Sequence, residues 1–369
     1  MAAILSTSDI HKLISNRWDE EALVKKTLAG IIGDAPSQYS KSPALWNAAF
    51  RHLGINAIYL PFDVDAVHLA DLLRLLRDSE PFIGVNVTVP HKVRVIDFLD
   101  ELDASAARIQ AVNTVVRDSS GKLTGYNTDG EGFIESVLLP TPEHPQGFMS
   151  SLEGMDVLLL GAGGSARAVA FHASDHIGEG RLIIANRTLA PARSLAGEIA
   201  KLGRRAIAID EADIPIWAPN AGLIVNATTK GQGGMRKVEP GQATILEPYS
   251  ALAPATPPML PENLGARFKN QWQLAARSGI KDNNHQSAIL AATIPITTRF
   301  YDLIYHPEET VFLRHGRETG HQIMNGKNMI VCQAVIAFCK ICRPHLKSLD
   351  KDTQATQREI AEVMFASWQ

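Results

Sequence analysis

A buried strand that runs directly into a glycine-rich loop is the feature of this sequence that most restricts its fold. Met155-Asp-Val-Leu-Leu-Leu160 is an apolar run of strand length, and Gly161-Ala-Gly-Gly-Ser-Ala166 follows it. Residues 166–173 then have helical character, and Leu182-Ile-Ile-Ala185 is a second apolar strand. This order predicts a βαβ unit whose glycines allow a tight turn and whose helix N-terminus faces the pyrophosphate of a dinucleotide. A tight turn with a structural purpose alone is the other interpretation of the same residues.

The residues after the second strand indicate which dinucleotide binds. An acidic residue at this point binds the ribose 2′-hydroxyl of NAD, whereas an arginine accommodates the 2′-phosphate of NADP. The sequence has Asn186-Arg187-Thr188 here and no carboxylate before Glu198. A guanidinium can stack on adenine while its planar fork meets a phosphate. We therefore expect NADP as the cofactor, with NAD as a weaker second.

The first half of the chain alternates strands with amphipathic helices. This alternation is typical of the α/β class, in which helices cover a mixed or parallel sheet. The apolar or alternating runs of strands are 28–33, 58–62 and 84–89, and the apolar spacing of helices occurs over 44–53 and 68–77. Residues 1–28 precede this pattern, and helical character over 9–26 predicts an N-terminal helical extension.

Lys92 follows the strand that carries Asn86 and Thr88. Pro90 ends that strand because proline cannot donate to a strand ladder. Most lysines are solvated surface charges, but side chains just past strand ends commonly bind ligands in open α/β sheets. Three other polar clusters support a functional interpretation: Ser40-Lys41-Ser42, Ala111-Val-Asn113-Thr-Val and Gly125-Tyr-Asn127-Thr128-Asp129-Gly130.

In this order, the motifs resemble the shikimate dehydrogenase family. The family pattern runs S-x-S-P, N-V-T-x-P-x-K, A-V-N-T, N-T-D-G, a glycine-rich nucleotide loop, N-R-T, N-A-T and D-x-x-Y, with a glutamine on the last core helix. The later motifs are present as Asn226-Ala-Thr228, Asp302-Leu-Ile-Tyr305 and Gln333. The resemblance covers roughly residues 29–234 and 299–342.

The resemblance implies two α/β domains with an active-site cleft between them. Residues 29–131 with 319–369 would form the substrate-binding catalytic domain. Residues 132–318 would form the Rossmann-type NADP-binding domain, including an insertion over 235–297 that the family lacks. The insertion could be a lid, an oligomer contact or a simple excursion, since loops tolerate extra length at little cost.

The implied activity is the reversible, NADP-dependent reduction of 3-dehydroshikimate to shikimate. Lys92 and Asp129 look like the pair that the family uses at the reacting hydroxyl, although a simple salt bridge is the alternative interpretation. The substrate would be bound by Ser40, Ser42, Thr88, Asn113 and Gln333, whose neutral polar groups suit a small polyhydroxylated carboxylate, and by Tyr305, a binding or packing residue near the nicotinamide. The cofactor would be bound by Gly161, Gly163, Gly164, Ser165, Ala166, Asn186, Arg187, Thr188, Arg193, Asn226 and Thr228.

Two positions depart from the family pattern. Pro191 stands about where NADP-using members often carry another arginine, and we expect Arg193 to take its place. Gly326-Lys-Asn328 replaces a usual Gly-x-Gly, which should need only a small adjustment. The retention of both Ser40 and Ser42 resembles the shikimate-preferring members of the family, whereas quinate-using relatives often alter the second serine. A quinate or aminoshikimate dehydrogenase and a non-catalytic metabolite-binding paralogue remain the alternatives, because fold does not fix function.

Composition excludes several other classes of protein. Apolar residues make up 45% and charged residues 20% of the 369 residues, which is typical of a globular protein. The formal net charge of −3 gives no electrostatic case for nucleic acid or an anionic membrane. No apolar run approaches the roughly 18 residues of a membrane span, and the opening residues lack the cationic region of a secretory signal. We expect a cytoplasmic monomer or homodimer that acts on a small molecule.

The three cysteines predict no metal site. Cys332, Cys339 and Cys342 lie in one apolar helical stretch, and no fourth ligand for zinc stands at a suitable spacing nearby. Buried, reduced thiols are therefore expected.

Overall fold

The computed structural model describes residues 7–19, 23 and 25–368. Their contacts divide the chain into two compact units, residues up to 135 together with 330 onward, and residues 136–329. The chain passes between the units within two helices, α6 (Asp129–Leu138) and α12 (Lys327–Ile341). The sequence predicts that the second unit ends at residue 318, but the chain returns to the first unit only at residue 330. The reason is that residues 323–324 form a strand of the second unit's sheet.

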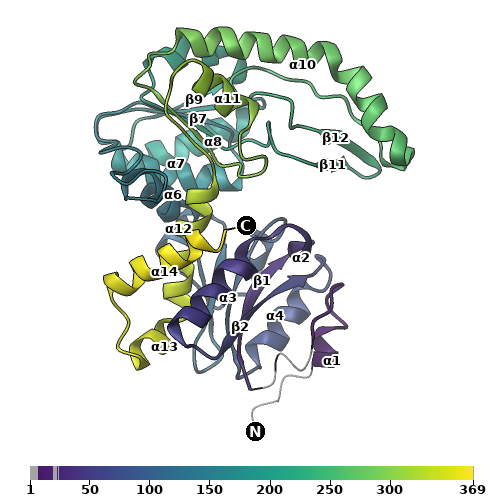
Figure 1. The fold of residues 1–369 in the computed structure, drawn as a ribbon, viewed down its shortest axis with the longest axis vertical. Helices are drawn as coiled ribbons and strands as arrows, with labels where there is room; N and C mark the ends of the chain where they lie inside the picture. The colour runs from purple at the N-terminus through teal and green to yellow at the C-terminus, as the bar shows by residue number, and fades with distance from the viewer. Residues whose placement is uncertain (1–6, 20–22, 24, 369) are drawn as a thin grey trace. The chain divides into compact units, whose positions relative to one another are not determined.

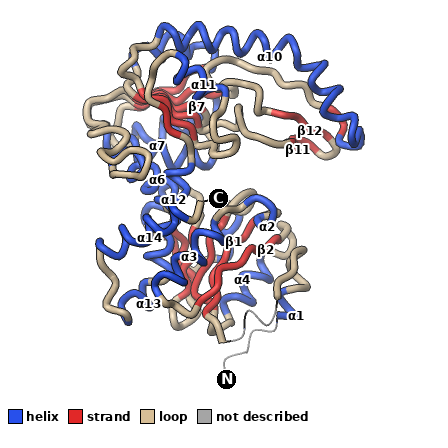
Figure 2. Tube along the Cα trace, in the orientation of Figure 1, coloured by secondary structure: helices blue, strands red, loops and turns tan. Residues whose placement is uncertain are grey.

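The first unit is a mixed six-stranded sheet with helices on both faces (Figures 1 and 2). The sheet order is β2-β1-β3-β5-β6-β4, in which β1 is parallel to β2 and β3, while β5 is antiparallel to both of its neighbours. The strands are β1 (Thr27–Gly33), β2 (Ala57–Asp63), β3 (Phe82–Val87), β4 (Glu101–Leu102), β5 (Thr114–Arg117) and β6 (Leu123–Tyr126). The helices that belong wholly to this unit are α1 (Thr7–Ile10), α2 (Pro36–Tyr39), α3 (Ser42–Leu53), α4 (Leu69–Arg77), the 3₁₀ helix η2 (Arg94–Phe98), α5 (Ala104–Ile109), α13 (Arg343–Ser348) and α14 (Gln354–Ala366).

Alternation along the strands produces two cores, one on each face of this sheet. Leu28 and Ile32 of β1 join the core that includes α4, whose four buried leucines recur at helical spacing. Ala29 and Ile31 face the other way and join the core formed by α3, α12 and α14. The second core fixes α12 against the sheet, which matters because α12 carries Gln333.

The predicted N-terminal helix over residues 9–26 is wrong for the described part of that segment. Helix α1 ends at Ile10, and the following residues bond instead to the outer strand β2. Ser15 N donates to Asp63 O at 2.8 Å, and the side chains of Asn16 and Trp18 donate to Pro61 O at 3.0 and 2.9 Å. An edge strand has backbone groups without a partner strand, and hydrogen bonds to them stabilise this segment more than its weak helical propensity would. Residues 20–22 and 24 lie outside the described residues.

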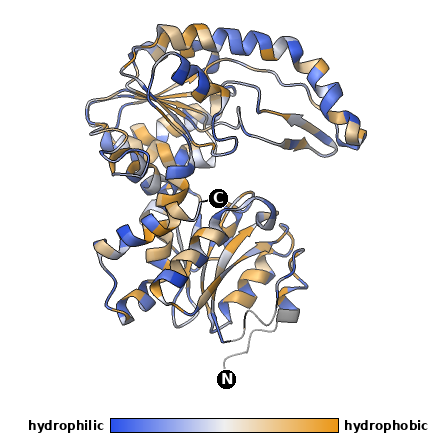
Figure 3. Cartoon of the chain, in the orientation of Figure 1, coloured by the Kyte–Doolittle hydropathy of each residue, from blue (hydrophilic) through white to orange (hydrophobic). Residues whose placement is uncertain are grey.

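The second unit confirms the predicted Rossmann-type architecture. Its sheet is parallel throughout, in the order β15-β14-β10-β7-β8-β9, which is the 3-2-1-4-5-6 order of dinucleotide-binding folds. The strands are β7 (Val157–Leu160), β8 (Leu182–Asn186), β9 (Ala206–Asp210), β10 (Leu223–Asn226), β14 (Arg299–Asp302) and β15 (Ile323–Met324). The helices are α7 (Gly164–His176), α8 (Leu189–Ala200), η3 (Glu211–Asp213), α9 (Ile214–Trp217), η4 (Ala218–Asn220) and α11 (Val311–Glu318). Figure 3 shows the strands of this sheet in hydrophobic colours.

The insertion forms a structure of its own between β10 and β14. It contains the antiparallel strands β11 (Met235–Glu239), β12 (Gln242–Ile245) and β13 (Leu260–Pro261), then η5 (Glu262–Arg267) and the 26-residue helix α10 (Phe268–Thr293). Figure 1 shows α10 extending along this unit to the small sheet. Tyr249, Phe268 and Trp272 are buried in a separate core there.

Helix α10 is continuous, although the apolar spacing along it is interrupted. The pattern is interrupted because polar residues occupy buried positions on α10. Asn283 is 2% exposed and donates to the carbonyls of Ser250, Ala253 and Pro254. A search for apolar spacing misses such a residue, although its hydrogen bonds make it compatible with burial. Within the described residues no helix, α10 included, has the combination of length and apolar character needed to cross a bilayer.

Candidate active site and nucleotide loop

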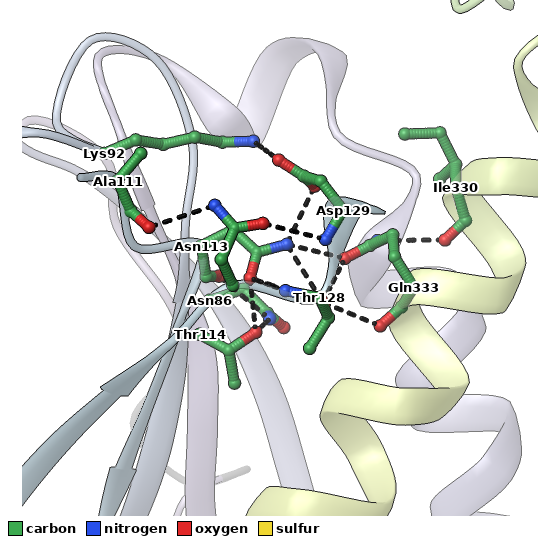
Figure 4. A network of polar contacts seen from close by, with 10 residues as sticks. Asn86, Lys92, Ala111, Asn113, Thr114, Thr128, Asp129, Ile330 and Gln333 are labelled. Atoms are coloured by element: carbon green, nitrogen blue, oxygen red, sulfur yellow. Dashed lines mark hydrogen bonds and ion pairs between the residues drawn. The ribbon is translucent and has the colours of Figure 1, made fainter. Parts of the chain in front are cut away.

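Lys92 and Asp129 form an ion pair in the first unit. The Nζ atom of Lys92 lies 2.6 Å from Oδ2 of Asp129, and their side chains are 22% and 9% exposed (Figure 4). Lys92 follows β3, and its carbonyl accepts a hydrogen bond from Val112 N at 2.7 Å. Asp129 begins α6, where a carboxylate interacts favourably with the helix dipole. The structure therefore brings the two predicted catalytic residues together in a site largely shielded from water.

Asn113 is the central residue of the polar network around this pair. Its Nδ2 lies 2.8 Å from Asp129 Oδ1, 2.9 Å from Thr128 Oγ1 and 3.3 Å from Gln333 Oε1. Its Oδ1 accepts from Thr128 N at 2.8 Å. Asp129 is thus held through one carboxylate oxygen by Asn113 and through the other by Lys92, which fixes the direction in which the ammonium points.

Gln333 reaches this network from α12. Its Nε2 donates to Ile330 O at 2.9 Å, so its Oε1 is the atom turned toward Asn113. Its carbonyl accepts from Thr128 Oγ1 at 3.1 Å. Gly132 permits this approach of α6 to α12, because a Cβ added there would lie 2.6 Å from the Gln333 backbone nitrogen. Gly132 is a positioning residue that the sequence analysis missed, although the motif Asp129-Gly-Glu-Gly132 contains it.

A second chain of hydrogen bonds connects Ser42 to the same network. Ser42 bonds to the hydroxyl of Tyr59, which donates to Asn86 Oδ1 at 2.7 Å. Asn86 Nδ2 in turn donates to Thr114 Oγ1 at 3.0 Å, and Thr114 Oγ1 donates to Asn113 Oδ1 at 3.0 Å. Burial raises the pKa of Tyr59 well above its usual value, so the phenol stays protonated and donates.

Ser40, Thr88 and Tyr305 are placed differently. Ser40 Oγ accepts from Ser42 N at 3.2 Å. Thr88 lies just past β3, and its methyl carbon is so close to Gly33 that a Cβ there would lie 2.5 Å away. Tyr305 belongs to the second unit, three residues past β14, where burial raises its pKa.

The glycine loop of the second unit has the open surface that a pyrophosphate requires. Gly161 has φ +111°, and a Cβ on it would lie 3.0 Å from Ala227 O, so the turn needs glycine. A Cβ on Gly163 or Gly164 would meet nothing within 4 Å. Both are exposed at the start of α7, whose next residues, Ser165 and Ala166, begin the packing against the sheet. The predicted loop residues thus fit a dinucleotide at a helix N-terminus.

The residues expected at the adenosine follow β8. Arg187, Thr188 and Arg193 are exposed, and Asn186 Nδ2 donates to Thr188 O at 2.7 Å, which shapes the turn into α8. Pro191 lies in the first turn of α8, where its missing N–H costs nothing. Arg187 is therefore exposed directly after β8, and Arg193 is exposed on the following helix α8.

Asp302, the acid of the D-x-x-Y motif, orders the loop after β10. Asn226 Nδ2 donates to Asp302 Oδ1 at 3.0 Å, while Asn226 Oδ1 accepts from Thr228 N at 2.9 Å. Asp302 is fully buried and also accepts from Ile304 N and Thr310 Oγ1. Its burial raises its pKa to about 7, against the opposite effect of these hydrogen bonds. The sequence analysis gave Asp302 no role.

Comparisons with known proteins point to one family. A family model described as the shikimate dehydrogenase substrate binding domain matches residues 31–115. A shikimate dehydrogenase (NADP+) of Methanopyrus kandleri is 35% identical over 84% of this chain and 88% of its own length. A crystal structure of shikimate 5-dehydrogenase from Thermus thermophilus in complex with NADP(H) and shikimate is 26% identical, with a TM-score of 0.62 over 92% of this chain and 99% of that one. A quinate dehydrogenase from Corynebacterium glutamicum in complex with NAD is also 26% identical, with a TM-score of 0.62 and the same coverage.

The buried Asp302 should make stability depend on pH. It stays protonated in the folded protein up to about pH 7, whereas an unfolded chain releases that proton near pH ~4. The folded state therefore binds more protons between these values, so the free energy of unfolding falls as pH rises through this window. Asp302→Asn removes this contribution, so its melting temperature should fall less than that of the wild type as pH rises from about 4 to about 7. Thermal unfolding at several pH values measures this.

Asp282→Asn is the matched control, because Asp282 is exposed on α10. Its melting curve should follow that of the wild type at every pH. If the Asp302→Asn curve also ran parallel to the wild type, Asp302 would not carry a raised pKa.

Proposed function

This chain belongs to the shikimate dehydrogenase family, and on that premise we propose that it catalyses the reversible, NADP-dependent reduction of 3-dehydroshikimate to shikimate. The observation that carries the proposal is the Lys92–Asp129 pair, held by Asn113 in a buried network. The pair is joined to two further positions that the family motifs single out, Thr128 and Gln333. A solvated salt bridge of no function would not need such a set of buried, mutually bonded partners.

The chain's own residues would handle the proton of the reaction. When bound, NADPH supplies a hydride to the carbonyl carbon. As the carbonyl oxygen gains negative charge, the Lys92 ammonium donates a hydrogen bond to it and then a proton, which completes the hydroxyl. Asp129 orients that ammonium through the ion pair, and in the direction of oxidation the same pair receives the hydroxyl proton.

The neutral polar groups of the first unit suit the rest of the substrate. Gln333 and Asn113 present amide groups next to the ion pair and can bind ring hydroxyls. Ser40 and Ser42 lie at the start of α3, where hydroxyl groups can bind a carboxylate. Quinate is the second candidate substrate, because a quinate dehydrogenase shares this fold over nearly its whole length. Serine at position 42 favours shikimate.

The first test is a substrate and cofactor screen of the purified protein. Shikimate and quinate, each with NADP and with NAD, are followed by the absorbance of the reduced cofactor. We expect the highest kcat/KM for shikimate with NADP, because Arg187 and Arg193 suit the 2′-phosphate. A preference for quinate would move the chain to the second candidate. No turnover with any pair would contradict an enzymatic role.

The second test concerns the ion pair. If Lys92 stabilises charge only as the alkoxide forms, Lys92→Ala should lower kcat by about 10²–10³ and change the KM for shikimate less. Asp129→Asn should also lower kcat strongly, because it removes the charge that orients Lys92. Because both residues act on one hydroxyl, the kcat of the double variant should be only slightly lower than that of the less active single variant.

Lys122→Ala is the matched control, since Lys122 forms an exposed ion pair with Glu101 at 2.7 Å in the same unit. Its turnover should equal that of the wild type. Near-normal turnover by Lys92→Ala would rule out the mechanism, and fully additive losses would show that the two residues act independently.

A further inference from the structure

A carboxylate lies beside the arginine that is expected at the 2′-phosphate. Strands β8 and β9 are parallel neighbours, and Asn186 of β8 is paired with Asp210 of β9. Arg187 and Glu211 directly follow that pair, and the 3₁₀ helix η3, which begins at Glu211, contacts β8. Asp210 is also close, but its carboxylate accepts from Ala212 N at 3.0 Å and caps the turn that follows.

An unpaired Glu211 would oppose the binding of NADP at this point. A 2′-phosphate on Arg187 would bring up to two negative charges within several ångströms of that carboxylate. At such distances, and with only partial access of water, like charges repel appreciably. NAD, which has a neutral 2′-hydroxyl, would not meet this repulsion.

Lys230 pairs with this carboxylate. Its Nζ lies 2.6 Å from Glu211 Oε2, and the two side chains are 12% and 13% exposed. Lys230 belongs to the loop after β10, so it is brought to the end of β9 from a different part of the chain. Burial lowers the pKa of Lys230 and the positive charge of Arg187 lowers it further, while Glu211 opposes both. Arg187 is therefore close enough for its charge to act on this pair.

The insertion fixes Lys230 in place. Lys230 Nζ also donates to Ala253 O at 2.9 Å, and that carbonyl accepts a second hydrogen bond from Asn283 Nδ2 at 2.9 Å. Asn283 is buried on α10. The segment that the resemblance left without a role thus supplies the acceptor that orients the lysine.

We propose that Lys230, anchored by the insertion, is a specificity-determining residue for NADP because it neutralises Glu211 beside Arg187. The proposal rests on the NADP dependence proposed above and concerns the adenosine 2′-phosphate alone. It also explains how a 2′-phosphate is accepted although Pro191 stands where relatives often carry an arginine. A positive charge that cancels a nearby negative one contributes to selectivity as a further arginine would.

The test compares two nucleotides that differ by one phosphate. Adenosine 2′,5′-bisphosphate and adenosine 5′-monophosphate are titrated calorimetrically into the full-length protein at one ionic strength. Wild type should prefer the bisphosphate. Lys230→Met should weaken bisphosphate binding by about tenfold or more and change monophosphate binding by less than about threefold, because it exposes the phosphate to an unpaired carboxylate. The ratio of the two affinities, taken on one sample, does not depend on how much of the variant is folded.

The double variant Lys230→Met/Glu211→Gln separates charge neutralisation from direct contact. With no carboxylate left to neutralise, it should regain the wild-type preference to within about threefold. Glu211→Gln alone should bind the bisphosphate at least as tightly as wild type, and this arm applies even if Lys230→Met does not fold. Lys237→Met is the matched control, because Lys237 is an exposed lysine of the insertion that forms an ion pair with Glu262, and its loss should change neither affinity.

The outcomes distinguish this inference from the proposed function. A wild type without preference for the bisphosphate would overturn NADP dependence, and the inference with it. A wild-type preference that Lys230→Met leaves unchanged would overturn the inference alone. A double variant as weak as Lys230→Met would also overturn it, since it would show that Lys230 contacts the phosphate or only maintains the fold. Arg187→Asp should abolish the preference for the bisphosphate in the wild type and in each Lys230 or Glu211 variant.

Discussion

The first unit depends on one constraint: a buried amide must have partners for all of its polar atoms. Asn113 is 3% exposed, and Asp129, Thr128, Gln333 and Thr114 provide the partners for its side chain. These residues come from β5, from the start of α6 and from α12, so satisfying one amide fixes three elements together. Lys92 gains its orientation as a consequence, because Asp129 has one oxygen left for it.

The second unit shows the same relation between a buried polar residue and an exposed loop. Asp302 accepts a hydrogen bond from Asn226, and Asn226 accepts one from the backbone of Thr228 in the following loop. Ala227 of that loop lies directly against the Gly161 turn. Lys230 continues the loop and reaches Glu211. In both units the atoms expected to meet ligands are therefore positioned by buried side chains that need not touch any ligand.

The parts of this protein that could be predicted from sequence are those with a local signal. The strand, glycine turn and helix at residues 155–173 specify the Rossmann-type unit. The ordered polar motifs single out Lys92, Asp129, Asn113 and Gln333, which the structure brings into one hydrogen-bonded network. Tyr59 gave no such signal, because a polar residue on a strand looks like any solvent-facing one until its burial is known. Lys230 and Glu211 are 19 residues apart in sequence, and only the folded structure shows that their side chains form an ion pair.

If Asn113 positions the residues proposed to bind substrate in the first unit, its loss should weaken the binding of substrate and leave the binding of NADP nearly unchanged. Titration of shikimate into Asn113→Ala tests it directly, with NADP titrated as an internal control. Loss of a central buried amide leaves Asp129 and Gln333 without a shared partner, at a cost of roughly 1–3 kcal/mol, so shikimate should bind about tenfold more weakly or worse. NADP affinity should stay within about twofold. Unchanged shikimate affinity in Asn113→Ala would contradict the account.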